Sequence, residues 1–178
     1  MSITRSDGAG QPQPLTQSKT LQTRWSFTPD GKRLVYFETG LKTGYVLWTM
    51  PMESDGAGLR AGIPEVFLQT PVNEHAPVFS PDGRWLANAS NESGIDQVYV
   101  RAFPDKGGKW QISNSSGVFP TWSRNGKELF FTTLDNHIMV AGYAVQGESF
   151  AAGKPRLWSE KKVGGLALPP QRLARSLC

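Results

Sequence analysis

The chain is organised around the stretch Pro77-Val78-Phe79-Ser80-Pro81-Asp82-Gly83-Arg84-Trp85-Leu86-Ala87, which occurs in three versions. The first version is Trp25-Ser26-Phe27-Thr28-Pro29-Asp30-Gly31-Lys32-Arg33-Leu34-Val35, and the third is Pro120-Thr121-Trp122-Ser123-Arg124-Asn125-Gly126-Lys127-Glu128-Leu129-Phe130. In each version an aromatic residue precedes a polar turn that ends in Gly, and a Leu follows three residues after that Gly. Repetition every ~40 to 50 residues, with short strands and turn signals, is typical of a β-propeller or a similar β array.

The composition favours an all-β domain. The 178 residues are 38% hydrophobic and 19% charged, and they include 19 Gly, 13 Pro and 6 Trp. Turn-forming residues and aromatic residues are both typical of sheets that are connected by short turns. A chain of this length can bury a core as one domain. No helical periodicity is sustained between residues 19 and 160.

Charge, cysteine content and the N-terminus limit the classes of function. The formal net charge is +4, but residues 161–178 carry four basic and no acidic side chains, so residues 1–160 are neutral overall. Because the body has no basic stripe, we expect no nucleic-acid binding. The single cysteine, Cys178, permits no internal disulfide. The sequence contains no long apolar run and no signal-peptide core, so we expect no membrane segment, and the cellular location stays unknown.

The turns and apolar runs divide the chain into units of four short strands. We interpret residues 1–18 as the last two strands of a blade, residues 19–71, 72–116 and 117–160 as three blades, and residues 161–178 as a degenerate basic tail. The expected strands are Trp25–Phe27, Arg33–Phe37, Tyr45–Met50, Glu65–Gln69, Ala76–Phe79, Trp85–Ala89, Gln97–Ala102, Lys109–Ile112, Phe119–Trp122, Glu128–Thr132, Ile138–Tyr143 and Arg156–Trp158. The predicted fold is therefore all-β, a partial β-propeller of four-stranded antiparallel blades with three full blades plus part of a fourth.

Outside the glycine turns, one pentapeptide also repeats, whereas one added segment and the tail depart from the repeat. The pentapeptide Ser6–Gly10 recurs unchanged as Ser54–Gly58, after a short strand in both places, and its Asp and Gly residues predict a tight connection. The additional segment Gly58–Pro64 explains why the first unit is the longest. A fourth Asp-Gly turn would be due near residues 168–171, where the chain has Leu168-Pro169-Pro170-Gln171 instead.

At these motifs the sequence resembles the TolB-like, WD-repeat-like β-propellers of bacteria. The residues that carry the resemblance are Phe79–Ala87, Ser90–Gly94 and Val98–Arg101. Val98–Phe103 together with Gly107–Ser113 is similar to the propeller that follows some bacterial serine/threonine kinase domains. The resemblance covers about residues 1–160, and it implies a parent ring of six or so blades.

The resemblance also implies a role in protein interaction or sensing, often outside the cytoplasm. The chain has no kinase motif and holds only three full blades plus a piece, so it looks like a fragment of such a propeller. An incomplete ring leaves blade edges uncovered, which makes self-association possible. A closed four-bladed ring, in which residues 1–18 complete a blade begun by the tail, is a further alternative. It is disfavoured because the tail lacks the signature of a first strand.

The antiparallel meander assigns the loops to two ends of the blades. The three Gly turns share one end. The loops between second and third strands, and those that lead into the next blade, share the other end. Because loops on a rigid scaffold commonly carry function, we expect the binding face at this second end. The candidate contact residues are Arg24, Glu74, His75, Asn91, Glu92, Phe119, Asp135 and His137.

Other polar and aromatic residues have a simpler structural explanation. His75, Asp135 and His137 match no metal-binding spacing, so we expect no metal site. Asp30 and Asp82 are expected to cap the backbone of their own turns. The tryptophans at positions 25, 85, 110, 122 and 158 are expected to pack in the core.

The sequence offers no catalytic constellation. It contains no Gly-x-Ser-x-Gly elbow, no phosphate-binding loop and no His-Glu-x-x-His motif, and we expect no cofactor. The first hypothesis is a non-catalytic module that binds a protein or a small ligand, as part of a larger sensor or kinase-linked protein. The alternative is the accessory propeller of an enzyme, either a serine/threonine kinase or a prolyl-oligopeptidase-type peptidase, whose catalytic domain lies outside this chain.

Overall fold

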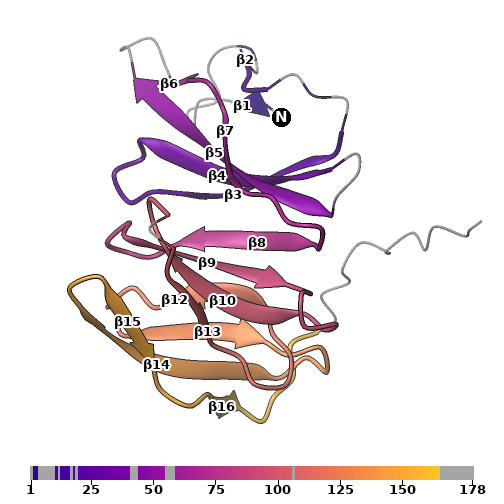
Figure 1. Cartoon of the computed structure of the whole chain (residues 1–178), viewed down its shortest axis with the longest axis vertical. Coiled ribbons are helices and arrows are strands. Elements are labelled where there is room, and N and C mark those ends of the chain that lie inside the picture. Colours follow the sequence, from indigo (N-terminus) through magenta and orange to yellow (C-terminus); the bar gives the residue numbers. More distant parts are fainter. Residues whose placement is uncertain are drawn as a thin grey trace, which may run out of the picture.

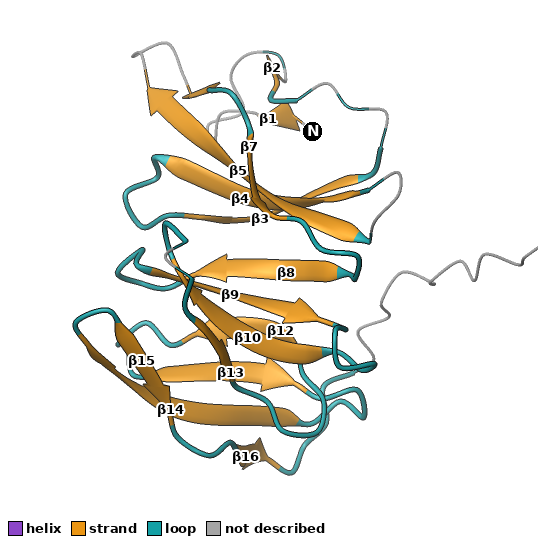
Figure 2. Ribbon diagram, in the orientation of Figure 1, coloured by secondary structure: helices purple, strands orange, loops and turns teal. Residues whose placement is uncertain are grey.

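The computed structural model describes residues 2–3, 11, 13–16, 18, 20–40, 44–54, 59–105 and 107–164. These ranges contain sixteen β-strands. Figure 2 draws the described residues as strands and loops, without a helix. The described residues include no helix of the length and apolar character that a membrane span requires. The prediction of an all-β chain is confirmed.

The first blade is built on the Asp-Gly turn at Gly31. Its strands are β3 (Gln22–Phe27), β4 (Arg33–Thr39), β5 (Tyr45–Ser54) and β7 (Glu65–Leu68), paired antiparallel in that order. The end of β5 continues past the blade and pairs with β6 (Leu59–Ala61). This hairpin occupies the segment that makes the first unit the longest.

The second blade is the most regular of the three. It contains β8 (Glu74–Phe79), β9 (Trp85–Ser90), β10 (Gln97–Ala102) and β11 (Lys109–Gln111), in the order β11-β10-β9-β8. All six residues of β9 are buried. A strand that is covered on both faces requires small or apolar side chains on both faces, and β9 reads Trp-Leu-Ala-Asn-Ala-Ser.

The third blade repeats the plan and adds a second hairpin. Its strands are β12 (Val118–Trp122), β13 (Glu128–Thr132), β14 (Ile138–Gln146) and β16 (Arg156–Ser159). The far end of β14 pairs with β15 (Ser149–Ala152). At the N-terminus, β1 (Ser2–Ile3) and β2 (Gln13–Pro14) form a separate antiparallel pair.

The blades stack face to face along the long axis of the molecule (Figure 1). Between the first two blades, Val35, Phe37 and Leu47 pack against Phe79 and Leu86. A larger core lies between the second and third blades, and its buried members are Trp85, Ala87, Val98, Val100, Ala102, Ile112, Trp122, Leu129, Phe131, Ala141 and Phe150. On the far face of the first blade, Leu15 packs against the cluster of Leu34, Tyr36, Met50 and Met52. The predicted partial propeller of three full blades plus part of a fourth is confirmed. The boundaries that the sequence analysis drew between the units remain a prediction.

One hydrogen-bond network recurs at all three glycine turns. In front of each turn, a side-chain hydroxyl accepts a hydrogen bond from the main-chain N–H five residues later. The hydroxyls of Thr28, Ser80 and Ser123 accept from Arg33, Trp85 and Glu128 in turn, over 3.0, 3.0 and 2.9 Å. The same hydroxyl donates to the side chain two residues on, which is Asp30, Asp82 or Asn125. The main-chain amides of Lys32 and Arg84 donate to the carboxylates of Asp30 and Asp82 over 3.0 and 3.1 Å, so the expected capping role of both residues is confirmed.

The tryptophans follow the expectation only in part. Trp85 and Trp122 are buried, and Trp110 is half-buried against the same core. Trp158 departs from the prediction, because 55% of its surface is exposed. The reason is its place in the last described strand, where no further blade covers it among the described residues. The side chain of Trp25, the Ser6–Gly10 loop, residues 55–58 and residues 165–178 lie outside the described part of the chain.

Candidate functional site

The candidate residues of the sequence analysis lie at the end of the blades opposite the glycine turns. Asn91 and Glu92 follow β9, and Asp135 and His137 lie between β13 and β14. Neighbouring loops at this end are bonded to one another. The amide of Asn73 donates to Asn91 Oδ1 over 2.9 Å, and the amide of Leu134 donates to Ser116 Oγ over 3.2 Å. Each bond therefore ties two neighbouring loops together.

Glu74 lies inside this surface. Its side chain is fully buried at the start of β8, where it accepts hydrogen bonds from Asn88 Nδ2 over 2.7 Å and from Thr70 Oγ1 over 3.1 Å. Burial raises the pKa of Glu74 above its ordinary value, although the bond from Thr70 and the charge of Arg101 act in the opposite direction. Glu74 therefore connects β8 to β9 through a buried hydrogen bond.

His75 is also held by the protein. Its Nε2 lies 3.1 Å from Asp96 Oδ1, and 8% of each residue is exposed. The ring of Tyr45 meets the imidazole edge-on, at 6.3 Å between centroids. The pair joins the start of β8 to the loop after β9, so its first role is to fix the loops of this end.

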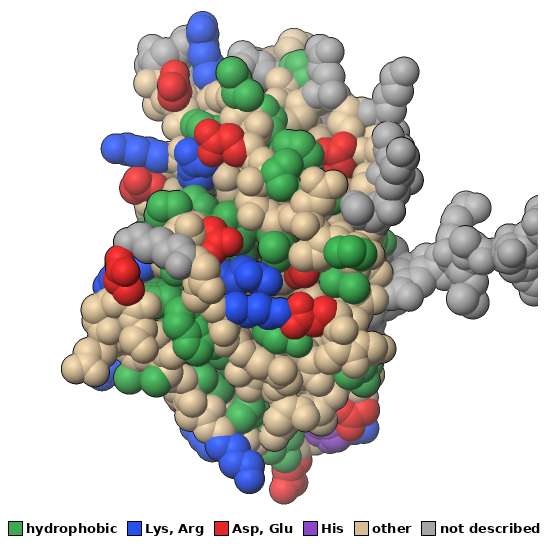
Figure 3. All heavy atoms as spheres, viewed as in Figure 1, with side chains coloured by type: hydrophobic (Ala, Val, Ile, Leu, Met, Phe, Trp, Pro, Cys, Tyr) green, Lys and Arg blue, Asp and Glu red, His purple; other side chains and the backbone are tan. Residues whose placement is uncertain are grey.

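Glu92 is exposed at this end of the blades, as Asp135 is. Lys109 Nζ donates to its carboxylate, and the same ammonium lies 4.2 Å from the centre of the Tyr99 ring. Partial burial opposes ionisation, but the hydrogen bonds from Lys109 and Tyr99 hold the pKa of Glu92 below its ordinary value. Figure 3 shows basic and acidic side chains intermixed on the visible face.

Asp135 and His137 belong to one turn. His137 Nδ1 lies 2.7 Å from Asp135 Oδ2, and Thr133 Oγ1 donates to the other carboxylate oxygen over 2.6 Å. The hydrogen bonds from Thr133 and His137 lower the pKa of Asp135. His137 thus pairs with Asp135, while His75 pairs with Asp96. Among the described residues, no three metal-ligating side chains gather in one place.

Phe119 marks a repeated irregularity of the inner strands. It has φ +52°, Ala76 has φ +51°, and each precedes a proline. The inner strands β3, β8 and β12 all shift register near this position. A positive φ at a residue other than Gly is a strained conformation that the surrounding structure must hold. Arg24 lies at the corresponding place in β3, but its side chain is outside the described part of the chain.

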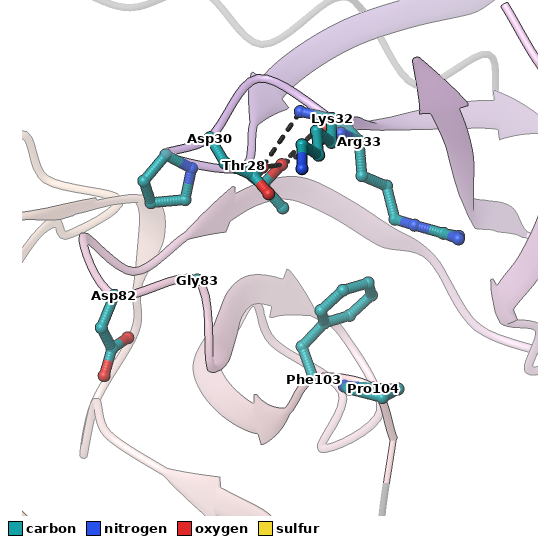
Figure 4. A pocket seen from close by; sticks show the side chains of 9 residues that line it. Thr28, Asp30, Lys32, Arg33, Asp82, Gly83, Phe103 and Pro104 are labelled. Carbon is teal, nitrogen blue, oxygen red and sulfur yellow. Dashed lines mark hydrogen bonds between the residues drawn. The ribbon is translucent and has the colours of Figure 1, made fainter. Parts of the chain in front are cut away.

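A groove that the sequence did not predict lies between the first two blades, at the end of the glycine turns. One cavity of about 490 Å³ is lined by Thr28, Pro29, Asp30, Lys32, Arg33, Asp82, Gly83, Phe103 and Pro104 (Figure 4). A second cavity of about 290 Å³ is lined by Arg33, Thr49, Glu65, Val66, Phe67, Phe103, Pro104 and Asp105. Both cavities share Arg33, Phe103 and Pro104, so we describe them together as the inter-blade groove.

Arg33 is fixed between the two cavities. Its guanidinium donates to Thr49 Oγ1 over 3.0 Å and to Glu65 Oε2 over 2.8 Å. The same group lies 5.9 Å from the centre of the Phe103 ring. Phe103 in turn meets Phe79 and Phe67, at 4.8 and 5.6 Å between centroids. The groove is thus lined by aromatic rings that pack on one another and by charged side chains.

No local signal could reveal this groove. Arg33 follows the turn of the first blade, while Phe103 and Pro104 follow the third strand of the second blade. They meet only because the blades stack. The sequence shows the glycine turns, but it predicts only a capping role for their Asp30 and Asp82.

No protein-family profile and no curated protein matches the chain. Among solved structures, it is similar to a protein assigned as TolB from Agrobacterium tumefaciens, with TM-score 0.62 and 20% identity over 85% of this chain and 55% of that one. It is also similar to a protein assigned as 6-phosphogluconolactonase from Bacteroides uniformis, with TM-score 0.54 and 16% identity over 88% of this chain and 50% of that one. A puromycin-hydrolyzing peptidase from Mycobacterium tuberculosis aligns with TM-score 0.57 and 13% identity, over 82% of this chain and 23% of the peptidase.

These likenesses confirm, at the level of the fold, the resemblance to TolB-like β-propellers that the sequence predicts. At such identities they show the fold alone. The chain spans about half the length of the first two structures.

Proposed function

We propose that this chain is a non-catalytic propeller module that binds an extended segment of a partner protein in the inter-blade groove. The observation that carries the proposal is the pair of adjoining cavities that share Arg33, Phe103 and Pro104. Binding sites are typically concave and largely apolar, with a few polar groups that fix orientation. The groove combines the ring of Phe103 and two prolines with charged side chains on its rim.

The free edge of strand β7 is the reason to expect an extended partner segment. It is the last strand on the path β3-β4-β5-β7, so one of its edges is unpaired among the described strands. Val66 and Glu65 line the second cavity, and Val66 is 46% exposed. An extended segment can add to such an edge through main-chain hydrogen bonds while a side chain enters the cavity beside Phe103. We further propose, as in the sequence analysis, that the parent is a sensor or kinase-linked protein.

The test is selection of peptides from a random phage-displayed library on the immobilised chain, followed by affinity measurement on Val66→Lys and Asp105→Lys. The two variants change the groove without touching a core residue. A control, Ile95→Lys, alters a residue of similar exposure (40%) in the loop after β9. We expect the groove variants to weaken binding and the control to leave it unchanged. Loss of binding in Asp135→Lys instead would place the site on the face that the sequence analysis favours.

The alternative function is an accessory propeller of an enzyme. The observation that favours it is the fold likeness to the puromycin-hydrolyzing peptidase, of which the aligned part is only 23%. A hydrolase or kinase domain encoded in the same reading frame would support this alternative. Turnover that depends on a point mutation within residues 20–160 would overturn the non-catalytic assignment.

A further inference from the structure

The far face of the third blade is apolar. Leu129 and Phe131 of β13 pack toward the second blade, so Phe130, which lies between them, belongs to the opposite face of the sheet. Val140 is paired directly with Phe130 and therefore shares that face. Trp158 of β16 meets Phe130 edge-on, at 5.8 Å between centroids, and is 55% exposed. We call the surface formed by Phe130, Ile138 and Trp158 the outer face of the third blade; Val140, which is 1% exposed, is buried beneath it.

The same positions are buried in the other two blades. Phe130 stands four residues after its turn glycine, as Val35 and Ala87 do after theirs. Val35 packs against the second blade and Ala87 against the third, and both are completely buried. Phe130 is only half-buried.

A second position follows the same rule. Ile138 faces Thr132 in the third blade, as Leu47 faces Phe37 in the first and Val98 faces Ala89 in the second. Leu47 and Val98 are completely buried between blades, whereas Ile138 is half-buried. The equivalent faces of the first and second blades are therefore covered by the next blade, whereas that of the third blade is not covered by one among the described residues.

We propose that the outer face of the third blade binds a second copy of this chain, so that two copies close one ring. The chain spans 55% and 50% of the lengths of two propeller structures that share its fold, so two copies restore about one complete ring. In this arrangement the third blade of each copy lies beside the N-terminal strands β1 and β2 of the other. Each contact joins the third blade of one copy to the N-terminal strands of the other. A two-fold rotation relates the two contacts, so the ring closes with two copies. This proposal is independent of the inter-blade groove.

The test is the mass of the chain in solution, measured by light scattering after size exclusion over a wide range of concentration. We expect a species of twice the 19.5 kDa of one chain. Trp158→Glu and Phe130→Glu should shift it to one chain, because each places a charge in an apolar contact. The control Ile95→Glu changes a side chain of comparable exposure in a loop of the second blade, and it should keep the wild-type mass.

Circular dichroism shows whether each variant is folded. If Phe130→Glu does not fold, Trp158→Glu decides the test, because Trp158 is exposed and its replacement leaves the core intact. Deuterium exchange gives a second readout, since peptides covering β13 and β16 should be more protected at high concentration than at low. A wild-type chain that is monomeric throughout would overturn the proposal, and would assign the face to blades of a longer polypeptide. Open assemblies larger than two chains, or a pair that survives both variants, would overturn it as well.

Discussion

The indole Nε1 of Trp122 donates a hydrogen bond to the main-chain oxygen of Val78 over 3.1 Å, across the boundary between the third and second blades. The bond joins the inner strands β12 and β8. The Trp122 ring also meets Tyr143 and Phe150, at 5.0 and 6.1 Å between centroids. An otherwise apolar interface thus contains a directional contact that fixes how the two blades are placed.

Replacing Trp122 by Phe should lower the free energy of unfolding by about 1 to 3 kcal/mol, because a buried hydrogen bond and part of a ring are lost. Trp85→Phe is the matched comparison. The Nε1 of Trp85 is buried and has no hydrogen-bond partner among the described residues, so its removal also relieves a penalty. Urea titration should show the smaller loss for Trp85→Phe. Equal losses would mean that the bond to Val78 contributes nothing.

The turn glycines offer a second comparison. Gly31 and Gly83 have φ of +71° and +70°, so alanine at either position should cost about 1 to 2 kcal/mol. A Cβ at position 31 meets nothing within 4 Å, whereas at position 83 it would lie 3.2 Å from Cδ of Pro29. Gly83→Ala should therefore be the more destabilising of the two in thermal unfolding. The reverse order would show that Pro29 yields without cost.

The hydroxyl network of the turns predicts unequal effects within one motif. Ser80 is buried and accepts from the amide of Trp85, so Ser80→Ala leaves a buried donor unpaired and should cost about 1 to 3 kcal/mol. Asp82 is exposed, and water can replace it at the amide of Arg84, so Asp82→Ala should cost under about 1 kcal/mol. Chemical denaturation of both variants measures the difference. A larger loss for Asp82→Ala would refute the proposed order.

Glu74 predicts a dependence of stability on pH. Since burial raises the pKa of Glu74 in the folded state, the folded chain holds this proton more tightly than the unfolded chain does. Its contribution to stability is therefore greatest below the ordinary value of 4.5 and declines as pH rises through the folded pKa.

The variant Glu74→Gln isolates this contribution. Its amide stays uncharged, and it can still bond to Asn88 and Thr70. Other carboxylates, such as Asp135, have lowered pKa values and are common to both proteins. The stability of Glu74→Gln relative to the wild-type chain should therefore rise from acidic to neutral pH. A difference that stays constant with pH would contradict a raised pKa.

Much of the fold could be predicted because each blade repeats one local pattern. The glycine turns place the second strand directly after them, and β4, β9 and β13 begin at the expected residues. The extensions of β5 and β14 were missed. Pro51 and Glu53 are unfavourable in strands, yet pairing with β6 holds this part of β5 extended. Local propensity does not contain such pairing.

The candidate site was less accessible to sequence reasoning. The meander correctly brings Asn91, Glu92 and Asp135 to one end of the blades, but their role in binding stays a prediction. The buried Glu74 bonds to Thr70, four residues before it, and to Asn88 on the neighbouring strand, and the second contact exists only because β8 and β9 pair. The inter-blade groove depends on how two blades stack, and no pattern within one blade encodes it.

The position of β9, whose six residues are all buried, has a consequence for the order in which the molecule opens. The second blade is shielded by a neighbour on each side, whereas the first and third each have one fully packed side. In arrays whose units contact only their neighbours, disruption starts at the ends and moves inward. The amide hydrogens of β9 should therefore be the slowest in the chain to exchange with solvent.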